Sequence, residues 1–216
     1  MSKVETVVFD MDGTILNTID DIAGAVNYIL KKYELPLRTV EEVKGFVGNG
    51  LKRTLLLSVP EGCSEDFVDS IFDEFTEYYK NHSNIYTQPY DGIVDALKEL
   101  KRRGYKLAVV SNKRHEAVVK LCDTFYKGLF DTMLGETEGI NRKPAPDMVN
   151  LVLDRLKSDK SRSVYVGDSD VDIKTANNSG LNGIYVSWGF RSKGFLISEG
   201  AECIVNTPEQ LLEILN

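Results

Sequence analysis

The sequence is poor in the features that anchor or stabilise a protein outside the cytosol. Its 216 residues include only three cysteines, and their spacing fits neither a CxxC metal pair nor a disulfide framework. No apolar run approaches the ~20 residues of a membrane span. The N-terminal segment MSKVETVVFD has acidic residues where a signal peptide would be apolar. These absences predict a cytoplasmic protein with reduced thiols and no membrane association.

Positive charge is also scarce. The chain has 26 Lys and Arg against 33 Asp and Glu, so its formal net charge is −7 at pH 7. Proteins that bind nucleic acid usually carry a basic surface, so we expect no nucleic-acid partner. The 42% hydrophobic and 27% charged residues match an ordinary globular protein. At about 150 residues per domain, the length favours a core domain with one insert. The oligomeric state stays open between a monomer and a homodimer.

Four short β-rich runs alternate with helical patterns, which is typical of a parallel sheet in an α/β fold. The runs cover residues 6–9, 106–110, 163–166 and 183–186, and the expected core helices cover 91–103, 114–124, 146–157, 169–178 and 208–215. Ligands of such sheets bind beyond the carboxyl ends of the strands. Polar residues follow three of the four runs, so we expect them to converge on one edge of the sheet.

The pattern changes between residues 16 and 86, where strand-like runs are absent and apolar residues recur at helical spacing. This stretch predicts an all-helical cap domain over 16–86, inserted into an α/β core domain formed by 1–15 and 87–216. An insert that leaves the sheet just after its first strand is placed to act as a lid over the strand ends.

Two carboxylates, Asp10 and Asp12, follow the first strand. Their spacing of two residues puts both on the same side of an extended chain. One can be ionised as nucleophile and metal ligand, while the other exchanges a proton with a substrate. Gly13 allows a sharp turn, after which backbone amides can face an anion. An Asp-Gly pair alone more often marks a simple turn, so this interpretation depends on the other motifs.

Two further motifs suit the oxygens of a phosphate. Ser111 and Asn112 follow the second strand, where a hydroxyl and free amides can bind an anion, although Ser-Asn is also an ordinary helix cap. Lys143 precedes Pro144 and could neutralise charge on a transferring phosphoryl group. The alternative for Lys143 is a solvated lysine in a loop.

Three acids follow the third strand within five residues: Asp168, Asp170 and Asp172. Carboxylate clusters of this kind suit Mg²⁺, a hard cation that prefers oxygen ligands. The alternative is a set of acids favoured by a helix N-terminus, which accounts for Asp170.

In this order, the motifs resemble those of the haloacid dehalogenase-like superfamily of phosphohydrolases. They are DMDGT at 10–14, Ser111-Asn112, Lys143-Pro144 and GDSDVD at 167–172. The resemblance covers essentially the whole chain, including a helical cap inserted after the first motif. It implies a Rossmann-like parallel sheet core with an all-helical cap, and a phosphoric monoester hydrolase.

The resemblance also implies roles for four acids. Asp10 would attack phosphorus in line and form an aspartyl-phosphate, while Asp12 would protonate the leaving oxygen and then activate water. Mg²⁺ would be held by Asp10, the main-chain carbonyl of Asp12 and Asp168. Asp172 would support this site from outside the coordination sphere. A metal is needed because an anionic nucleophile approaches an anionic phosphate.

The remaining motif residues would bind the substrate. The resemblance places Ser111, the amide of Asn112 and Lys143 on the phosphoryl oxygens. Thr14, at the end of the first motif, is also expected at the substrate.

A second group of residues indicates a branch of the superfamily. The run VGNG at 47–50, together with Asp20-Asp21-Ile22, is similar to phosphoglycolate phosphatases. Gly48 would shape a cap loop at the substrate, and Arg53 or Lys52 could bind a substrate carboxylate. A solvated helix surface is the alternative for both cations.

Related β-phosphoglucomutases carry a histidine twelve residues after the nucleophile, where this chain has Ile22. This difference favours a hydrolase over a phosphomutase. Asn17 stands where phosphoglycolate phosphatases usually have Asp, and it also resembles pyrophosphatase and nucleotidase relatives. Trp188 follows the fourth strand and is expected to be a packing residue.

The sequence therefore predicts a Mg²⁺-dependent phosphatase for a small phosphorylated metabolite similar to phosphoglycolate. The alternatives are a β-phosphoglucomutase-like phosphomutase and a pyrophosphatase or nucleotidase of the same superfamily. A catalytically silent binding protein is a further alternative, because a fold does not guarantee a function. Such a protein would be expected to lack Asp10 or Asp12, and both are present.

Overall fold

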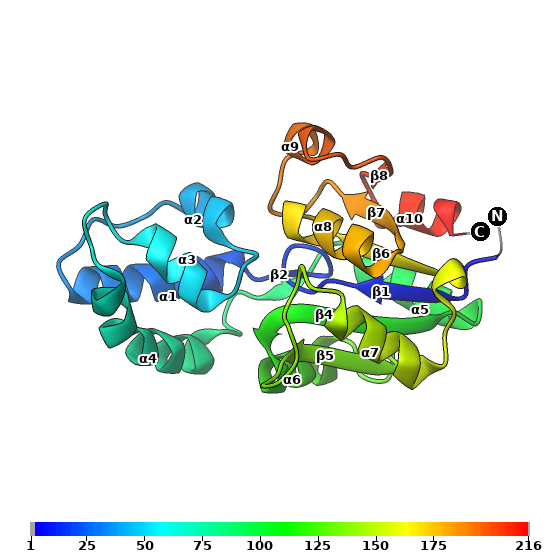
Figure 1. The fold of residues 1–216 in the computed structure, drawn as a ribbon, viewed down its shortest axis with the longest axis horizontal. Coiled ribbons are helices and arrows are strands. Elements are labelled where there is room, and N and C mark those ends of the chain that lie inside the picture. Colours follow the sequence, from blue (N-terminus) through cyan, green and yellow to red (C-terminus); the bar gives the residue numbers. More distant parts are fainter. Residues whose placement is uncertain (1–2, 216) are drawn as a thin grey trace. The chain divides into compact units, whose positions relative to one another are not determined.

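The computed structural model describes residues 3–215, and the chain divides into two compact units (Figure 1). One unit contains the residues up to Leu16 and from Pro89 onward, and the other is Asn17–Gln88. The chain passes from one unit to the other through β2 (Leu16–Asn17) and β3 (Gln88–Pro89). These two short strands pair as a two-stranded sheet.

The larger unit is built on a six-stranded sheet with the order β5-β4-β1-β6-β7-β8. Its strands are β1 (Thr6–Phe9), β4 (Lys106–Arg114), β5 (Thr132–Glu136), β6 (Ser163–Gly167), β7 (Asn182–Val186) and β8 (Ile204–Val205). Neighbouring strands pair in parallel. Because β1 lies between β4 and β6, the residue that follows β1 is at the middle of the carboxyl edge of the sheet.

Helices cover both faces of this sheet, as parallel strands require for their crossover connections (Figure 1). They are α5 (Ile93–Arg102), α6 (His115–Phe125), α7 (Asp147–Leu156), α8 (Asp170–Ser179), α9 (Lys193–Ser198) and α10 (Pro208–Ile214), with a short 3₁₀ turn at Lys160–Arg162. Side chains alternate across a strand. Val7 and Phe9 therefore pack with α5, α6 and α10, whereas Val8 packs with α7 and α8. This architecture confirms the predicted α/β fold class.

The structure differs from the sequence expectation at one strand that bears on the site. The second β-rich run was expected to end at residue 110, but β4 continues to Arg114. Its register with β5 shifts between Val110 and Arg114, so an irregularity carries the strand past Ser111 and Asn112. These two residues therefore lie within the strand and not in a loop after it.

The smaller unit contains four helices: α1 (Ile19–Lys32), α2 (Val40–Phe46), α3 (Leu51–Ser58) and α4 (Glu65–His82). Helices α1 and α4 pack together, and the rings of Tyr28 and Tyr78 stack with their centroids 3.6 Å apart. Ile22 is buried in this unit. That this unit acts as a cap over the strand ends remains a prediction.

A buried carboxylate ties the end of the smaller unit to its beginning. Asp21, in the first turn of α1, accepts hydrogen bonds from the backbone N–H groups of Ile85, Tyr86 and Thr87. The hydroxyl of Thr87 donates a further bond of 2.7 Å to the same carboxylate. This network fixes the segment that leads into β3.

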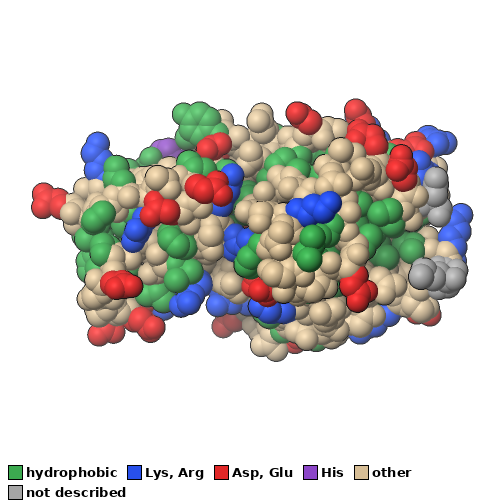
Figure 2. All heavy atoms as spheres, turned by 90° about the horizontal axis from the view of Figure 1, so that it is seen from above, with side chains coloured by type: hydrophobic (Ala, Val, Ile, Leu, Met, Phe, Trp, Pro, Cys, Tyr) green, Lys and Arg blue, Asp and Glu red, His purple; other side chains and the backbone are tan. Residues whose placement is uncertain are grey.

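Acidic and basic side chains are interspersed with apolar ones over the face of the molecule shown in Figure 2. Within residues 3–215, no helix combines the length and apolar character needed to cross a membrane. The expected absence of a nucleic-acid partner stays a prediction.

Candidate active site

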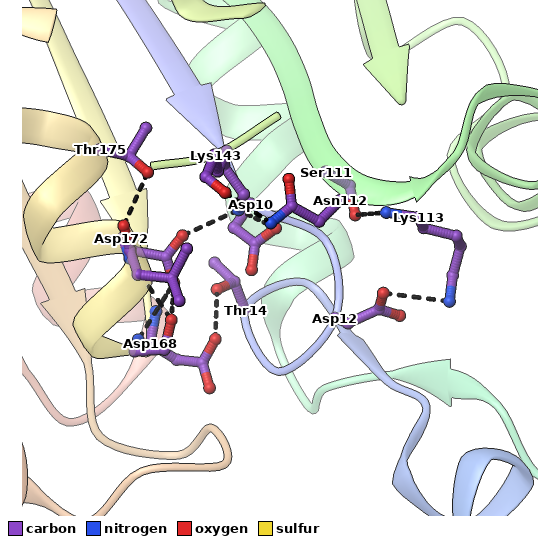
Figure 3. A network of polar contacts seen from close by, with 12 residues as sticks. Asp10, Asp12, Thr14, Ser111, Asn112, Lys113, Lys143, Asp168, Asp172 and Thr175 are labelled. Carbon is purple, nitrogen blue, oxygen red and sulfur yellow. Dashed lines mark hydrogen bonds and ion pairs between the residues drawn. The ribbon is translucent and has the colours of Figure 1, made fainter. Parts of the chain in front are cut away.

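Asp10 directly follows β1 at the centre of the carboxyl edge. Its backbone N–H donates to the carbonyl of Val166 in β6 at 2.8 Å, so the parallel pairing continues one residue beyond the strand. The side chain is 10% exposed, and Oδ1 accepts a hydrogen bond of 2.7 Å from Lys143 Nζ. The central strand thus presents one carboxylate in a fixed, largely buried position (Figure 3).

Lys143 lies in the segment between β5 and α7 and is 3% exposed. Its ammonium group donates to Asp10 Oδ1, to Asp172 Oδ1 at 2.9 Å and to Tyr165 Oη at 3.0 Å. Burial alone would lower the pKa of Lys143, but the carboxylates of Asp10 and Asp172 raise it above its ordinary value. The side-chain amide N–H of Asn112 donates a hydrogen bond of 3.0 Å to the backbone carbonyl of Lys143. Lys143 is therefore a fixed positive charge.

Asp172 is the anchor for this lysine. Its Oδ2 accepts the backbone N–H groups of Asp168 and Ser169, at 3.2 and 3.1 Å, and the hydroxyl of Ser169 at 2.6 Å. Ser169 is the N-cap of α8, so the same bonds form a capping box. Burial would raise the pKa of Asp172, but Lys143 and the Ser169 hydroxyl hold it below its ordinary value. Asp172 is consequently ionised, and both of its carboxylate oxygens already accept hydrogen bonds from other protein groups.

Asp168 is held by a side-chain hydroxyl from one loop and a backbone N–H from another. It is 1% exposed, and its Oδ1 accepts the hydroxyl of Thr14 at 3.1 Å while its Oδ2 accepts the N–H of Phe190 at 2.7 Å. Gly13 and Gly189 leave space for this carboxylate, since a Cβ on Gly189 would stand 2.5 Å from Asp168 Oδ2. Gly13 also has a φ of +88°, in the region that favours glycine. Burial, together with the nearby Asp172, raises the pKa of Asp168 to about 7.

The three acids Asp10, Asp168 and Asp172 offer oxygen atoms that all lie within 4.8 Å of one another. With all three carboxyl groups ionised, they and Lys143 would carry three negative charges and one positive charge, which would leave two negative charges in a buried space. Burial raises the pKa of Asp10, and the neighbouring acids add to this effect. A divalent cation would neutralise the excess, and carboxylate oxygens are suitable ligands for it. Asp10 and Asp168 fit this role better than Asp172, because the oxygens of Asp172 accept five hydrogen bonds from the protein, whereas among the described residues one such bond is made to Asp10 and one to each oxygen of Asp168.

Asp12 lies apart from this acid cluster and pairs with a second buried lysine (Figure 3). Its Oδ2 is 3.0 Å from Lys113 Nζ, and the two side chains are 15% and 4% exposed. Asp12 Oδ1 is buried and has no hydrogen-bond partner among residues 3–215. The backbone N–H of Lys113 donates to Ser111 Oγ at 3.2 Å. Lys113 and Ser111 are therefore positioned by the same irregular part of β4.

The structure brings most of the predicted site residues together in the larger unit. These are Asp10, Asp12, Thr14, Ser111, Asn112, Lys143, Asp168 and Asp172. Gly48 and Arg53 belong to the smaller unit. Gly48 has a φ of +126° just before α3, and Arg53 is exposed on that helix. Lys52 forms an ion pair of 2.6 Å with Asp69, whereas no ion pair involves Arg53 within the described part of the chain.

Sequence reasoning missed several groups that shape the site. It gave no role to Lys113, Tyr165 or Ser169, although Lys113 directly follows the Ser-Asn motif. Trp188 was expected to be a packing residue, and it does pack against the main core. Its indole N–H also donates to the carbonyl of Thr14 at 3.0 Å, which links the loop after β7 to the first motif.

Comparison with known proteins gives a consistent result. The family model described as haloacid dehalogenase-like hydrolase matches residues 7–186. The phosphoglycolate phosphatase of Aquifex aeolicus is 29% identical over 214 residues, which cover 99% of this chain and 97% of that relative. The pyrophosphatase PpaX of Bacillus pumilus is 28% identical over 215 residues, with coverages of 99% and 97%.

A solved structure is also closely similar. It is that of a protein from Lactobacillus delbrueckii subsp. bulgaricus that is predicted to be a phosphoglycolate phosphatase. The TM-score is 0.94 at 40% sequence identity, and the match covers 99% of this chain and 98% of the other. The likeness therefore extends over nearly the whole of both chains.

Proposed function

The chain belongs to the haloacid dehalogenase-like hydrolase family, in its phosphoglycolate phosphatase-like branch of phosphoric monoester hydrolases, and we propose that it is a Mg²⁺-dependent phosphatase for a small phosphorylated metabolite. The observation that carries the proposal is the carboxylate of Asp10, held by Lys143 beside Asp168 at the centre of the strand ends. The proposed setting is the cytoplasm, and the proposed substrate class resembles phosphoglycolate.

In the first half of the reaction, an oxygen of Asp10 attacks phosphorus and the bond from phosphorus to the leaving oxygen breaks. Asp12 gives a proton to that leaving oxygen, so the leaving group departs as an alcohol. Mg²⁺, with Asp10 and Asp168 as its fitting ligands, would offset the repulsion between the attacking carboxylate and the phosphate. The product on the enzyme is an aspartyl-phosphate.

In the second half, Asp12 takes a proton from water while the water oxygen attacks phosphorus. The bond between phosphorus and Asp10 breaks, and inorganic phosphate is released with Asp10 restored. The buried Oδ1 of Asp12, which lacks a hydrogen-bond partner within residues 3–215, supports this role because it can bond to a leaving oxygen or to water.

The phosphoryl oxygens would be bound by Ser111, the amide of Asn112 and Lys143. All three side chains are buried at the carboxyl edge of the sheet. The hydroxyl of Thr14 donates to Asp168 and its backbone N–H donates to the carbonyl of Met11, so a contact from Thr14 to the substrate would replace one of these bonds. Backbone amides and a fixed ammonium group can stabilise charge on the transferring group without reorganisation.

The smaller unit, Asn17–Gln88, is proposed to be the cap that excludes bulk water during transfer. Within it, Arg53 is the proposed contact for a substrate carboxylate, because it is exposed while its neighbour Lys52 is paired with Asp69. Gly48 would shape the loop before α3 at its positive φ.

The test is phosphate release from phosphoglycolate, pyrophosphate, sugar phosphates and nucleoside monophosphates, each with Mg²⁺ and with EDTA. Mg²⁺-dependent release that peaks on one compound supports the proposal and identifies the branch. Pyrophosphate is included because the Bacillus pumilus relative is a pyrophosphatase. Isomerised sugar phosphate without free phosphate would favour a phosphomutase, and no turnover of any compound would favour a silent binding protein.

A further inference from the structure

Lys113 is the second buried lysine at the carboxyl edge of the sheet, and the reaction as described above leaves it without a role. It lies on β4, its side chain is 4% exposed, and its ammonium nitrogen is 3.0 Å from Asp12 Oδ2. Burying an ion pair costs desolvation energy that the pair itself often only just offsets. A buried cation in this position is therefore expected to have a further use.

The two buried lysines are on different sides of the site. Lys143 directs its ammonium group to Asp10, Asp172 and Tyr165, on the side where the phosphoryl group would be attacked. Lys113 is beside Asp12, away from Asp168 and Asp172 (Figure 3). In the proposed reaction Asp12 passes its proton to the leaving oxygen, so the leaving group must lie next to Asp12. It is then also within reach of Lys113.

We propose that Lys113 binds a negative charge on the leaving group of the substrate. The inference rests on the proposed phosphatase function and names its substrate class: phosphate compounds whose leaving group carries a second anion close to the bond that breaks. A carboxylate, as in phosphoglycolate, and a second phosphate, as in pyrophosphate, share this chemistry. In the low dielectric of a buried site, an anion gains more from an ammonium group than it would in water.

The test uses pairs of substrates that differ in this charge. Phosphoglycolate is compared with phosphoglycolamide, which replaces the carboxylate by an uncharged amide of the same size. Pyrophosphate is compared with methyl phosphate, which identifies a second phosphate as the source of the charge. The ratio of kcat/KM values within each pair is measured for the wild-type enzyme and for Lys113→Met.

The wild-type enzyme should prefer the charged member of at least one pair, and Lys113→Met should reduce that preference by about ten- to a hundredfold, as for the loss of one charge-assisted hydrogen bond. Lys113→Arg should keep the preference because it keeps the charge. Lys98→Met is the matched control, since it removes an exposed lysine of α5 and should leave the ratio unchanged.

Binding gives a second readout that does not depend on the rate of chemistry. In an Asp10→Asn background, calorimetric titration should show Lys113→Met weakening phosphoglycolate much more than phosphoglycolamide. Equal losses for the two compounds would overturn the inference, because they would mean that Lys113 only positions Asp12. Equal wild-type rates on both members of each pair would also overturn it while leaving the phosphatase intact. The absence of any phosphate release by the wild-type enzyme would instead contradict the proposed function.

Discussion

Gly189 offers a direct test of how the loop after β7 positions Asp168. A Cβ at this residue would lie 2.5 Å from Asp168 Oδ2, and it would also meet the backbone carbonyl of Gly13, which has little freedom to move. Gly189→Ala therefore forces the carboxylate or the loop to shift. Overpacking of this kind costs about 1–3 kcal/mol of folding free energy. In a chain of this size, each kcal/mol lowers Tm by roughly 2–4 °C.

The shift should also weaken the binding of the metal ion. Disturbing a group that orients a ligand typically costs about ten- to a hundredfold in metal affinity, so Gly189→Ala should raise the Mg²⁺ concentration for half-maximal activity by that order. Thermal melting and a Mg²⁺ titration of phosphate release measure the two effects. Asp168→Ala removes the carboxylate itself and so sets the upper limit of the effect on the Mg²⁺ concentration for half-maximal activity. Gly194→Ala is the matched control, because a Cβ there has no atom within 4 Å. An unchanged Tm and an unchanged Mg²⁺ titration in Gly189→Ala would refute the reasoning.

Three other predictions concern separate parts of the chain. Arg53→Ala should reduce kcat/KM for phosphoglycolate by roughly tenfold more than for p-nitrophenyl phosphate. Lys52→Ala, the control, should show no such difference. Equal losses of kcat/KM on both substrates in Arg53→Ala would argue against carboxylate recognition by Arg53. Trp188→Phe keeps an aromatic ring but removes the donor to the Thr14 carbonyl. Tm should therefore fall by an amount corresponding to about 1 kcal/mol. An unchanged Tm would mean that this hydrogen bond is not stabilising. Because the pKa of Asp168 is raised to about 7, protons compete with the cation below that pH, and Mg²⁺ should raise Tm more at about pH 8 than at about pH 5.5. Equal Mg²⁺ shifts at the two pH values would contradict this competition.

The strands with continuous apolar runs could be predicted from the sequence because both of their faces are buried. Val7, Val8 and Phe9 in β1 illustrate this pattern. By contrast, β5 was missed because its sequence TMLGE is short and mixed, and it becomes a strand only through pairing with β4. The two-residue strand β8 and the short helix α9 also lack a periodic signal of useful length.

The positions of the acids could be anticipated because the carboxyl ends of parallel strands meet at one edge. Asp10 and Asp168 follow β1 and β6, which are neighbours in the sheet. The pairing of Lys113 with Asp12 could not be anticipated, since it depends on the irregular register that carries β4 past residue 110. The need for Gly189 was equally hidden, because it arises from a contact with Asp168, 21 positions earlier in the chain.

The central claim is that Asp10 forms a covalent bond to phosphorus, and trapping this intermediate tests it most directly. Enzyme quenched in acid during turnover would be reduced with borohydride, which converts an aspartyl-phosphate to homoserine, and its peptides would be examined by mass spectrometry. The account predicts homoserine at Asp10 only in the presence of substrate, and no modification together with no turnover in a folded Asp10→Asn variant. Rapid phosphate release by Asp10→Asn, or homoserine at a different aspartate, would contradict the account.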